Sequence, residues 1–263
     1  MSEISGKFAE LKDRGEKGLI LYVTAGDPSI EHLPQIIECL VEGGADLIEI
    51  GLPYSDPIAD GPVIQSSTQR ALESGVTPQK ILKKLSEQNF AVPLVLMGYY
   101  NTVLRIGLEE AARGFSAAGL SGTILSDLTL EESLNWCEVS RAHHLDNIFL
   151  AAPTSTDSRL DQIVSKASGF VYAVSRTGVT GAANEVPREA KELVARLKAR
   201  TELPIAVGFG VSTVEHVRMI ADVADGVVIG SWLVDLLHRE WKDGKGADQI
   251  AERIRSLKSA TRS

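Results

Sequence analysis

The sequence contains little cysteine and no long hydrophobic run. Its two cysteines, Cys39 and Cys137, lie in segments with a helical hydrophobic pattern, and their spacing fits neither a metal site nor a disulfide framework. No hydrophobic run approaches the ~18 residues of a membrane-spanning helix, and the charged amino terminus lacks the apolar centre of a signal peptide. We therefore expect reduced, buried thiols in a soluble, cytoplasmic protein.

Positive charge and clusters of metal ligands are also scarce. The 27 Lys and Arg residues face 35 Asp and Glu residues, which gives a net charge of −8, and no segment concentrates the basic residues. This balance disfavours nucleic acid and anionic membranes as partners. The five histidines fall in expected helices or at their ends, so we expect no catalytic metal. We also expect no other cofactor.

The sequence does contain a regular alternation of strand and helix patterns. Eight short segments rich in β-branched residues predict strands at 19–24, 46–50, 93–97, 122–126, 147–151, 170–174, 204–208 and 226–230. Amphipathic stretches predict crossover helices at 31–42, 108–118, 131–143, 158–167, 188–200 and 213–223. This alternation predicts an α/β fold, a (β/α)8 TIM barrel formed as a single domain by residues 1–263.

Two connections are longer than a barrel requires. The stretch between the second and third strands has room for a loop and extra helices at 63–74 and 78–88. The polar, glycine-containing segment after the sixth strand, at about 175–187, is expected to form a lid over the active site. At the other end of the chain, we expect residues 256–263 to fray.

Glu49 is the first candidate for catalysis. The active site of such a barrel lies at the carboxyl ends of the strands. Side chains alternate along a strand, so Ile48 and Ile50 are expected to face the helices and Glu49 the barrel mouth. A carboxylate there loses hydration, which raises its pKa toward neutrality and suits proton transfer. A structural ion pair is the alternative for this residue.

The loop after this strand adds two further acids, Asp56 and Asp60. Two carboxyl groups in different environments suit acid–base catalysis. The loop is also rich in turn formers, and Asp60 could instead cap the helix that starts near Pro62. The sequence by itself leaves both interpretations of Asp60 open.

Glycines after the last two strands indicate a phosphate site. Gly208 and Gly210 follow the seventh strand, and Gly230 and Ser231 open a helix, expected at 231–240, after the eighth. Backbone N–H groups and a helix amino terminus bind a phosphate dianion well at this position in barrels. Other strand ends carry residues that suit a flat aromatic ligand. These residues are Tyr22, Thr24, Tyr99, Tyr100, Asn101, Asp127 and Tyr172.

Three segments resemble one known family. They are YVTAGDP at 22–28, EIGLPYSDPIADGPVIQ at 49–65 and SRTGVTG at 175–181. Over essentially its whole length the sequence is similar to the tryptophan synthase alpha chain. The resemblance implies retro-aldol cleavage of indole-3-glycerol phosphate to indole and glyceraldehyde 3-phosphate. It also implies an alpha2-beta2 tetramer in which a beta chain converts the indole to tryptophan. Composition and spacing alone predict only that the protein is a barrel that acts on a phosphorylated aromatic compound.

The resemblance also implies roles for individual residues. Glu49 corresponds to the general acid–base group and Asp60 to a second catalytic acid, while Asp56 lies on the loop that faces the beta chain. The implied substrate-binding residues are Tyr22, Met97, Tyr99, Ile124, Tyr172, Thr180, Gly181, Gly210, Gly230 and Ser231. Two alternatives to the complete synthase remain: a stand-alone lyase that releases indole, and a catalytically weak activator of the beta chain.

Overall fold

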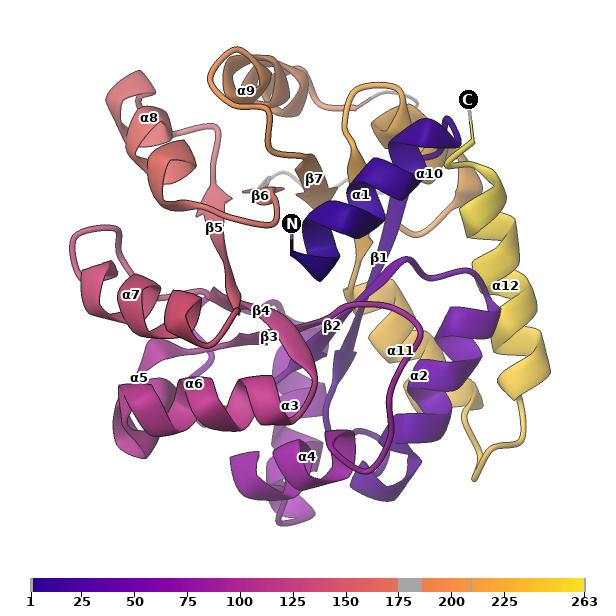
Figure 1. The fold of residues 1–263 in the computed structure, drawn as a ribbon. Helices are drawn as coiled ribbons and strands as arrows, with labels where there is room; N and C mark the ends of the chain where they lie inside the picture. Colours follow the sequence, from indigo (N-terminus) through magenta and orange to yellow (C-terminus); the bar gives the residue numbers. More distant parts are fainter. Residues whose placement is uncertain (1, 175–185, 209, 263) are drawn as a thin grey trace.

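Eight parallel strands form a closed barrel (Figure 1). The barrel closes where β8 pairs with β1. The computed structural model describes residues 2–174, 186–208 and 210–262. The strands are β1 (Gly18–Thr24), β2 (Leu47–Gly51), β3 (Leu94–Gly98), β4 (Leu120–Leu125), β5 (Asp146–Ala151), β6 (Val171–Val174), β7 (Ile205–Gly208) and β8 (Gly226–Ile229). The predicted (β/α)8 barrel is confirmed, with each strand end within two residues of its expected place.

Helices surround the barrel and follow the strands in the predicted alternation (Figure 1). They are α1 (Glu3–Asp13), η1 (Ile30–His32), α2 (Leu33–Glu42), α3 (Pro62–Glu73), α4 (Pro78–Leu85), α5 (Tyr100–Ile106), α6 (Leu108–Ala117), α7 (Leu134–Ala142), α8 (Asp157–Lys166), α9 (Arg188–Lys198), α10 (Val214–Ala221), α11 (Ser231–Glu240) and α12 (Ala247–Ser259). The expected extra helices after the second strand are α3 and α4. The helix predicted from residue 131 starts at Leu134, because the Glu132 N–H closes a turn onto the Thr129 carbonyl.

Alternation along β2 separates the two hydrophobic layers as expected. Ile48 and Ile50 pack into the layer between the barrel and its helices, whereas Leu47 packs inside the barrel with Ile20 and Val95. Glu49 shares the inward face of Leu47. From α1, Ile4 and Phe8 join the interior cluster, so this helix closes the amino end of the barrel. The register of β2 therefore directs a carboxyl group into the barrel mouth.

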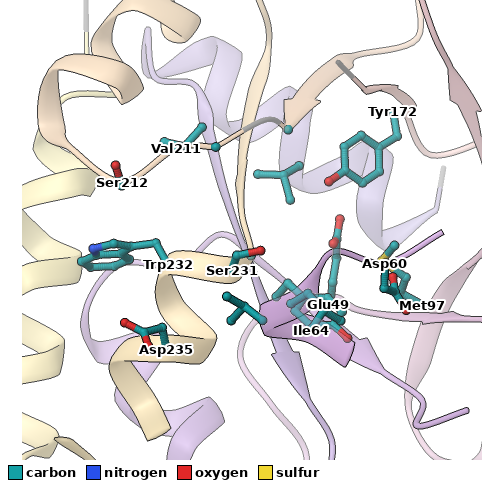
Figure 2. Close-up of a pocket in the computed structure, with 16 residues that line it drawn as sticks. Glu49, Asp60, Ile64, Met97, Tyr172, Val211, Ser212, Ser231, Trp232 and Asp235 are labelled. Atoms are coloured by element: carbon teal, nitrogen blue, oxygen red, sulfur yellow. The ribbon is translucent and has the colours of Figure 1, made fainter. Parts of the chain in front are cut away.

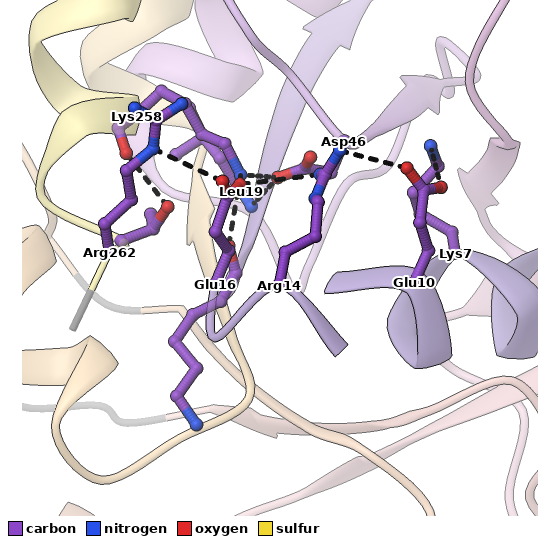
Figure 3. A network of polar contacts seen from close by, with 10 residues as sticks. Lys7, Glu10, Arg14, Glu16, Leu19, Asp46, Lys258 and Arg262 are labelled. Atoms are coloured by element: carbon purple, nitrogen blue, oxygen red, sulfur yellow. Dashed lines mark hydrogen bonds and ion pairs between the residues drawn. The ribbon is translucent and has the colours of Figure 1, made fainter. Parts of the chain in front are cut away.

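The expected fraying of residues 256–263 is wrong for the residues that the structure describes there. Helix α12 continues to Ser259, and Lys258 is buried against the beginnings of β1 and β2 (Figure 3). Lys258 Nζ lies 2.7 Å from Asp46 Oδ2 and 3.1 Å from Glu16 Oε2. Asp46 Oδ2 also accepts a hydrogen bond of 2.7 Å from the Leu19 N–H. Burial raises the pKa of Asp46, and Lys258 offsets only part of that effect.

Candidate active site

A cavity of about 480 Å³ opens at the carboxyl end of the barrel (Figure 2). It brings together most of the residues proposed from the sequence. The proposed residues in its lining are Tyr22, Glu49, Asp60, Met97, Tyr172, Gly210, Gly230 and Ser231. Tyr99 and Ile124 are not in the lining, and Ile124 packs in the hydrophobic cluster inside the barrel. Thr180 and Gly181 lie outside the described residues.

Glu49 lies on the inward face of β2, between Tyr22 of β1 and Val95 of β3. Its side chain is 1% exposed, and neither carboxyl oxygen has a hydrogen-bond partner among the described residues. The interpretation of Glu49 as a structural ion pair finds no partner in that part of the chain. Burial raises the pKa of Glu49 to about 8. The carboxyl group therefore carries a proton at neutral pH and can donate it.

This shifted pKa makes the stability of the fold depend on pH. An unfolded glutamate loses its proton near 4.5, whereas Glu49 in the folded protein retains it to about pH 8. Between these values the folded state binds more protons than the unfolded state. The free energy of unfolding contributed by Glu49 therefore falls as the pH rises across this window.

Two tyrosine rings occupy the cavity beside Glu49, and each requires a glycine on the neighbouring strand. A Cβ atom on Gly51 would lie 2.0 Å from the Tyr22 hydroxyl oxygen, and one on Gly208 would lie 2.4 Å from that of Tyr172. Burial raises the pKa of both tyrosines, so both remain neutral hydroxyl groups. Figure 2 shows the Tyr172 ring and the Glu49 carboxyl group directed toward the same space.

Asp60 lies on the loop between β2 and α3, and a hydrogen bond from Tyr99 holds its side chain in place. The Tyr99 hydroxyl donates a hydrogen bond of 3.1 Å to Asp60 Oδ2 and accepts one of 3.0 Å from the Ala59 N–H. Burial raises the pKa of Asp60, and the hydrogen bond from Tyr99 opposes this shift. Helix α3 has Gly61 at its N-cap and no side-chain cap, so the capping interpretation of Asp60 is wrong.

Residues after β3 and β4 support this loop rather than line the cavity. The Tyr99 ring stacks on Tyr54 with ring centres 4.9 Å apart, and the Asn101 amide donates a hydrogen bond of 2.7 Å to the Tyr54 hydroxyl. Helix α5 begins directly after β3, and Asp127 accepts a hydrogen bond of 2.6 Å from the Tyr100 N–H in its first turn. Of the residues expected to line the mouth for a flat aromatic ligand, only Tyr22 and Tyr172 do so. The lining lacks Thr24, Tyr99, Tyr100, Asn101 and Asp127.

The opposite wall of the cavity is suited to an anion. Helix α11 starts at Ser231 with Gly230 at its N-cap and no side-chain cap, which leaves amide groups of its first turn for a ligand. Gly210 adopts a left-handed conformation with φ of 50°. A Cβ atom on Gly230 would make only ordinary contact with Tyr22, at 3.7 Å. The wall therefore has bare backbone and open space where a phosphate group would fit.

Several lining residues were not found by sequence reasoning. Val63 and Ile64 enter the cavity from the first turn of α3, and Trp232 and Asp235 from α11. In Figure 2 the latter two lie across the cavity from Tyr172. The sequence could have predicted these residues, because both helices begin directly after segments that were proposed for the site. A first turn that follows such a loop lies next to the strand ends.

Two further observations concern metals and membranes. Within residues 2–174, 186–208 and 210–262, no group of three or more His, Cys, Asp or Glu side chains could hold a metal ion. No helix in that part of the chain combines the length and hydrophobicity needed to cross a bilayer. The absence of a cofactor stays a prediction.

The fold and the cavity define a class, the (β/α)8-barrel enzymes with an active-site cavity at the carboxyl ends of the strands. Comparisons with known proteins then identify the family. A family model described as "Tryptophan synthase alpha chain" matches residues 8–262. The chain is 44% identical to the tryptophan synthase alpha chain of Carboxydothermus hydrogenoformans over 268 residues, covering 99% of this chain and 100% of the relative. It is 46% identical to that of Geobacter sulfurreducens over 241 residues, which cover 91% of each chain.

Solved structures agree with this result. A structure of Mycobacterium tuberculosis tryptophan synthase has a TM-score of 0.91 and 38% identity, covering 100% of this chain and 99% of the other. The tryptophan synthase alpha subunit of Legionella pneumophila has a TM-score of 0.90 and 34% identity, covering 99% and 98%. The chain belongs to the tryptophan synthase alpha chain family. It is a carbon–carbon lyase of tryptophan biosynthesis, which cleaves indole-3-glycerol phosphate to indole for a beta chain.

Proposed function

We propose that Glu49 moves the proton in this cleavage and that Asp60 stabilises the positive charge that develops on the indole ring. In the reaction, C3 of the indole ring gains a proton, and the bond from C3 to the hydroxyl-bearing carbon breaks. The hydroxyl group loses its proton as the aldehyde forms, so one proton moves from oxygen to carbon overall. The observation that carries the proposal is the buried Glu49 carboxyl group, without a hydrogen-bond partner among the described residues, in the cavity that Asp60 also lines.

Glu49 is assigned both proton steps, the protonation of C3 and the removal of the hydroxyl proton. Its carboxyl group holds a proton at neutral pH and can deliver it to C3. The carboxylate that results is buried without a neighbouring cation among the described residues, so it is a strong base for the hydroxyl proton. One group can therefore start and finish the cycle unchanged.

Asp60 is assigned the charge that develops on the indole ring. Protonation of C3 makes the ring a cation, with the positive charge centred on its nitrogen. A carboxylate that accepts the indole N–H would stabilise this cation. The hydrogen bond from Tyr99 favours the charged form of Asp60 and fixes its position. Asp60 therefore serves as an electrostatic partner of Glu49 rather than as a second shuttle.

The substrate phosphate is assigned to the first turn of α11, with Gly210, Gly230 and Ser231 around it. The uncapped helix end supports this assignment. Thr180 and Gly181 would close over the bound substrate, and this role stays a prediction because both lie outside the described residues. In this proposal residues 1–263 act as one barrel domain, and a cytoplasmic location stays a prediction.

The phosphate assignment predicts a large effect of charge at Gly230. We expect Gly230→Asp to weaken binding of glyceraldehyde 3-phosphate by about 10-fold or more, because it places a carboxylate beside a dianion. Isothermal titration calorimetry measures this affinity. Gly230→Asn is the matched control, since it has nearly the same size without the charge, and we expect it to retain most of the affinity. Equal losses in the two variants would show that the effect is steric, and unchanged binding in both would place the phosphate elsewhere.

The chain also offers a surface for a beta chain. The large exposed hydrophobic side chains in the described part of the chain are Ile58 (85% exposed), Leu104 and Leu134. They follow β2, β3 and β4 in turn, so all three lie at the carboxyl end of neighbouring strands. Exposed hydrophobic groups gathered at one end are typical of protein interfaces. Tryptophan synthase structures imply a beta chain partner, and we propose that an alpha2-beta2 tetramer forms through this surface.

Loss of this surface should release the beta chain. We expect Ile58→Asp to weaken association with the beta chain by about 30-fold, the effect typical of an interface hot spot. Size-exclusion chromatography with light scattering across a concentration series measures it. Ser256→Asp on the exposed face of α12 is the control and should leave the tetramer intact. If the wild-type chain forms no complex with the beta chain, the stand-alone lyase is correct instead. The intact pair of Glu49 and Asp60 argues against a catalytically weak activator.

A further inference from the structure

A second cavity, of about 570 Å³, lies at the opposite end of the barrel from the active site. Its lining comes from the beginning of α1, the start of β4 and the start of β5. The strands of the barrel begin at this end, so none of these residues can reach the substrate described above. Its titratable groups are Glu3, Arg141, His144 and Asp146.

Asp146 is the unusual member of this set. It is 7% exposed, and its Oδ2 is buried without a hydrogen-bond partner among the described residues. Asp146 lies close against Gly169, where a Cβ atom would be 3.1 Å from Oδ2. A buried polar atom without a hydrogen-bond partner costs free energy in the folded state, and one of the two carboxyl oxygens of Asp146 is such an atom. Because Asp146 lines the cavity, a ligand in that cavity could supply the missing partner.

The other charged groups narrow the chemistry of such a ligand. Glu3 already accepts a hydrogen bond of 2.6 Å from the Ser121 hydroxyl. Arg141, in the last turn of α7, is exposed and forms no ion pair within the described part of the chain. An inorganic anion would suit Arg141 but would be repelled by Asp146. The described acids and histidines there do not form a metal-binding group. A ligand that satisfies both residues carries a cationic nitrogen and an anionic group.

We propose that this cavity binds a free α-amino acid. The ammonium group donates to Asp146, the carboxylate faces Arg141, and the side chain lies against the apolar wall of Leu120 and Leu145. Both leucines are buried in the cavity lining. A charge-assisted hydrogen bond to a buried carboxylate is among the stronger polar contacts in proteins. This site is independent of the catalytic assignment, since it shares no residue with the active-site cavity.

Calorimetric titration of the intact chain tests the proposal with glycine, L-serine and L-tryptophan as probes of increasing side-chain size. We expect saturable 1:1 binding of at least one probe. Asp146→Asn and Arg141→Gln should each weaken it by about 10-fold or more. Both variants should cleave indole-3-glycerol phosphate at the wild-type rate, which separates this site from the active site. Ethylamine and acetate, which carry only one of the two charges, should bind at least about 10-fold more weakly than the amino acid.

A second measurement keeps the test valid if Asp146→Asn perturbs the fold. Removal of an unpaired buried charge should raise the free energy of unfolding of the ligand-free chain, measured by urea denaturation, whereas a structural role for the charge would lower it. Arg141 is exposed, so Arg141→Gln tests ligand binding without this concern. The proposal is overturned if none of the three amino acids binds saturably, if binding survives both substitutions, or if ethylamine binds as tightly as the amino acid.

Discussion

Replacement of Glu49 by glutamine is expected to lower kcat/KM for cleavage of indole-3-glycerol phosphate by about 10²–10⁴-fold. Glutamine keeps the size of the side chain but cannot give up a proton and take it back. The side chain is buried inside the barrel mouth without a hydrogen-bond partner among the described residues, so the amide breaks no contact there. The loss should therefore appear in catalysis, while the fold and the affinity for glyceraldehyde 3-phosphate are kept.

The matched control is Glu73→Gln, the same chemical change at an exposed position on α3. Its rate should stay within about twofold of the wild type, because an exposed surface group takes no part in the site. Indole release from the purified chain, followed together with glyceraldehyde 3-phosphate, measures both variants. A Glu49→Gln chain that retains more than about a tenth of the wild-type rate would remove Glu49 from the mechanism.

Replacement of Lys258 by methionine is expected to lower the free energy of unfolding by about 3–5 kcal/mol. Methionine keeps much of the hydrophobic stem that packs against Gly44 but removes the ammonium group. Asp46 and Glu16 would then lose the cation that they share (Figure 3). An uncompensated buried charge costs more than the ion pair itself contributes, which is why the expected effect is large.

Lys198→Met is the control for this measurement. Lys198 also pairs with an aspartate, Asp225, at 3.3 Å, but its side chain is 42% exposed. We expect a change of about 1 kcal/mol or less there, because water screens an exposed pair. Urea denaturation at neutral pH measures both variants. Equal changes in the free energy of unfolding in the two variants would show that burial does not increase the contribution of the Lys258 ion pairs to stability.

The barrel was predictable because each strand carries its own signal. β-branched segments bounded by glycine, proline or aspartate recur at the spacing of a β/α unit, and no competing period interrupts them. The sequence did not predict helices α1, α5 and α12. Helix α1 carries Ile4, Phe8 and Leu11 at helical spacing. Its charged residues were used only as an argument against a signal peptide, and this hydrophobic pattern was overlooked. Residues 256–263, which include the end of α12, were expected to fray, because the partners of Lys258 lie more than 200 residues away in the sequence.

The candidate site was predictable where one strand decides the geometry and less so where several elements meet. Alternation along β2 was enough to direct Glu49 into the mouth. The role of Asp60 came from the resemblance, because its contact with Tyr99 joins a loop after β2 to the end of β3. Tyr100 and Asn101 were misplaced because α5 begins without a loop after β3. The unpaired Asp146 had no sequence signal, since its missing partner is evident only in the folded chain.

Direct titration of the Glu49 carboxyl group tests the central claim of a buried proton donor most directly. Carbon-13 NMR of a chain labelled at the glutamate carboxyl carbon, compared with Glu49→Gln, isolates the single resonance of this residue. The structure predicts a midpoint near pH 8, because burial without a partner disfavours the charged form. A Glu49 resonance that titrates near 4.5, the ordinary value for a glutamate, would show a carboxylate with no proton to deliver at neutral pH and would contradict the mechanism.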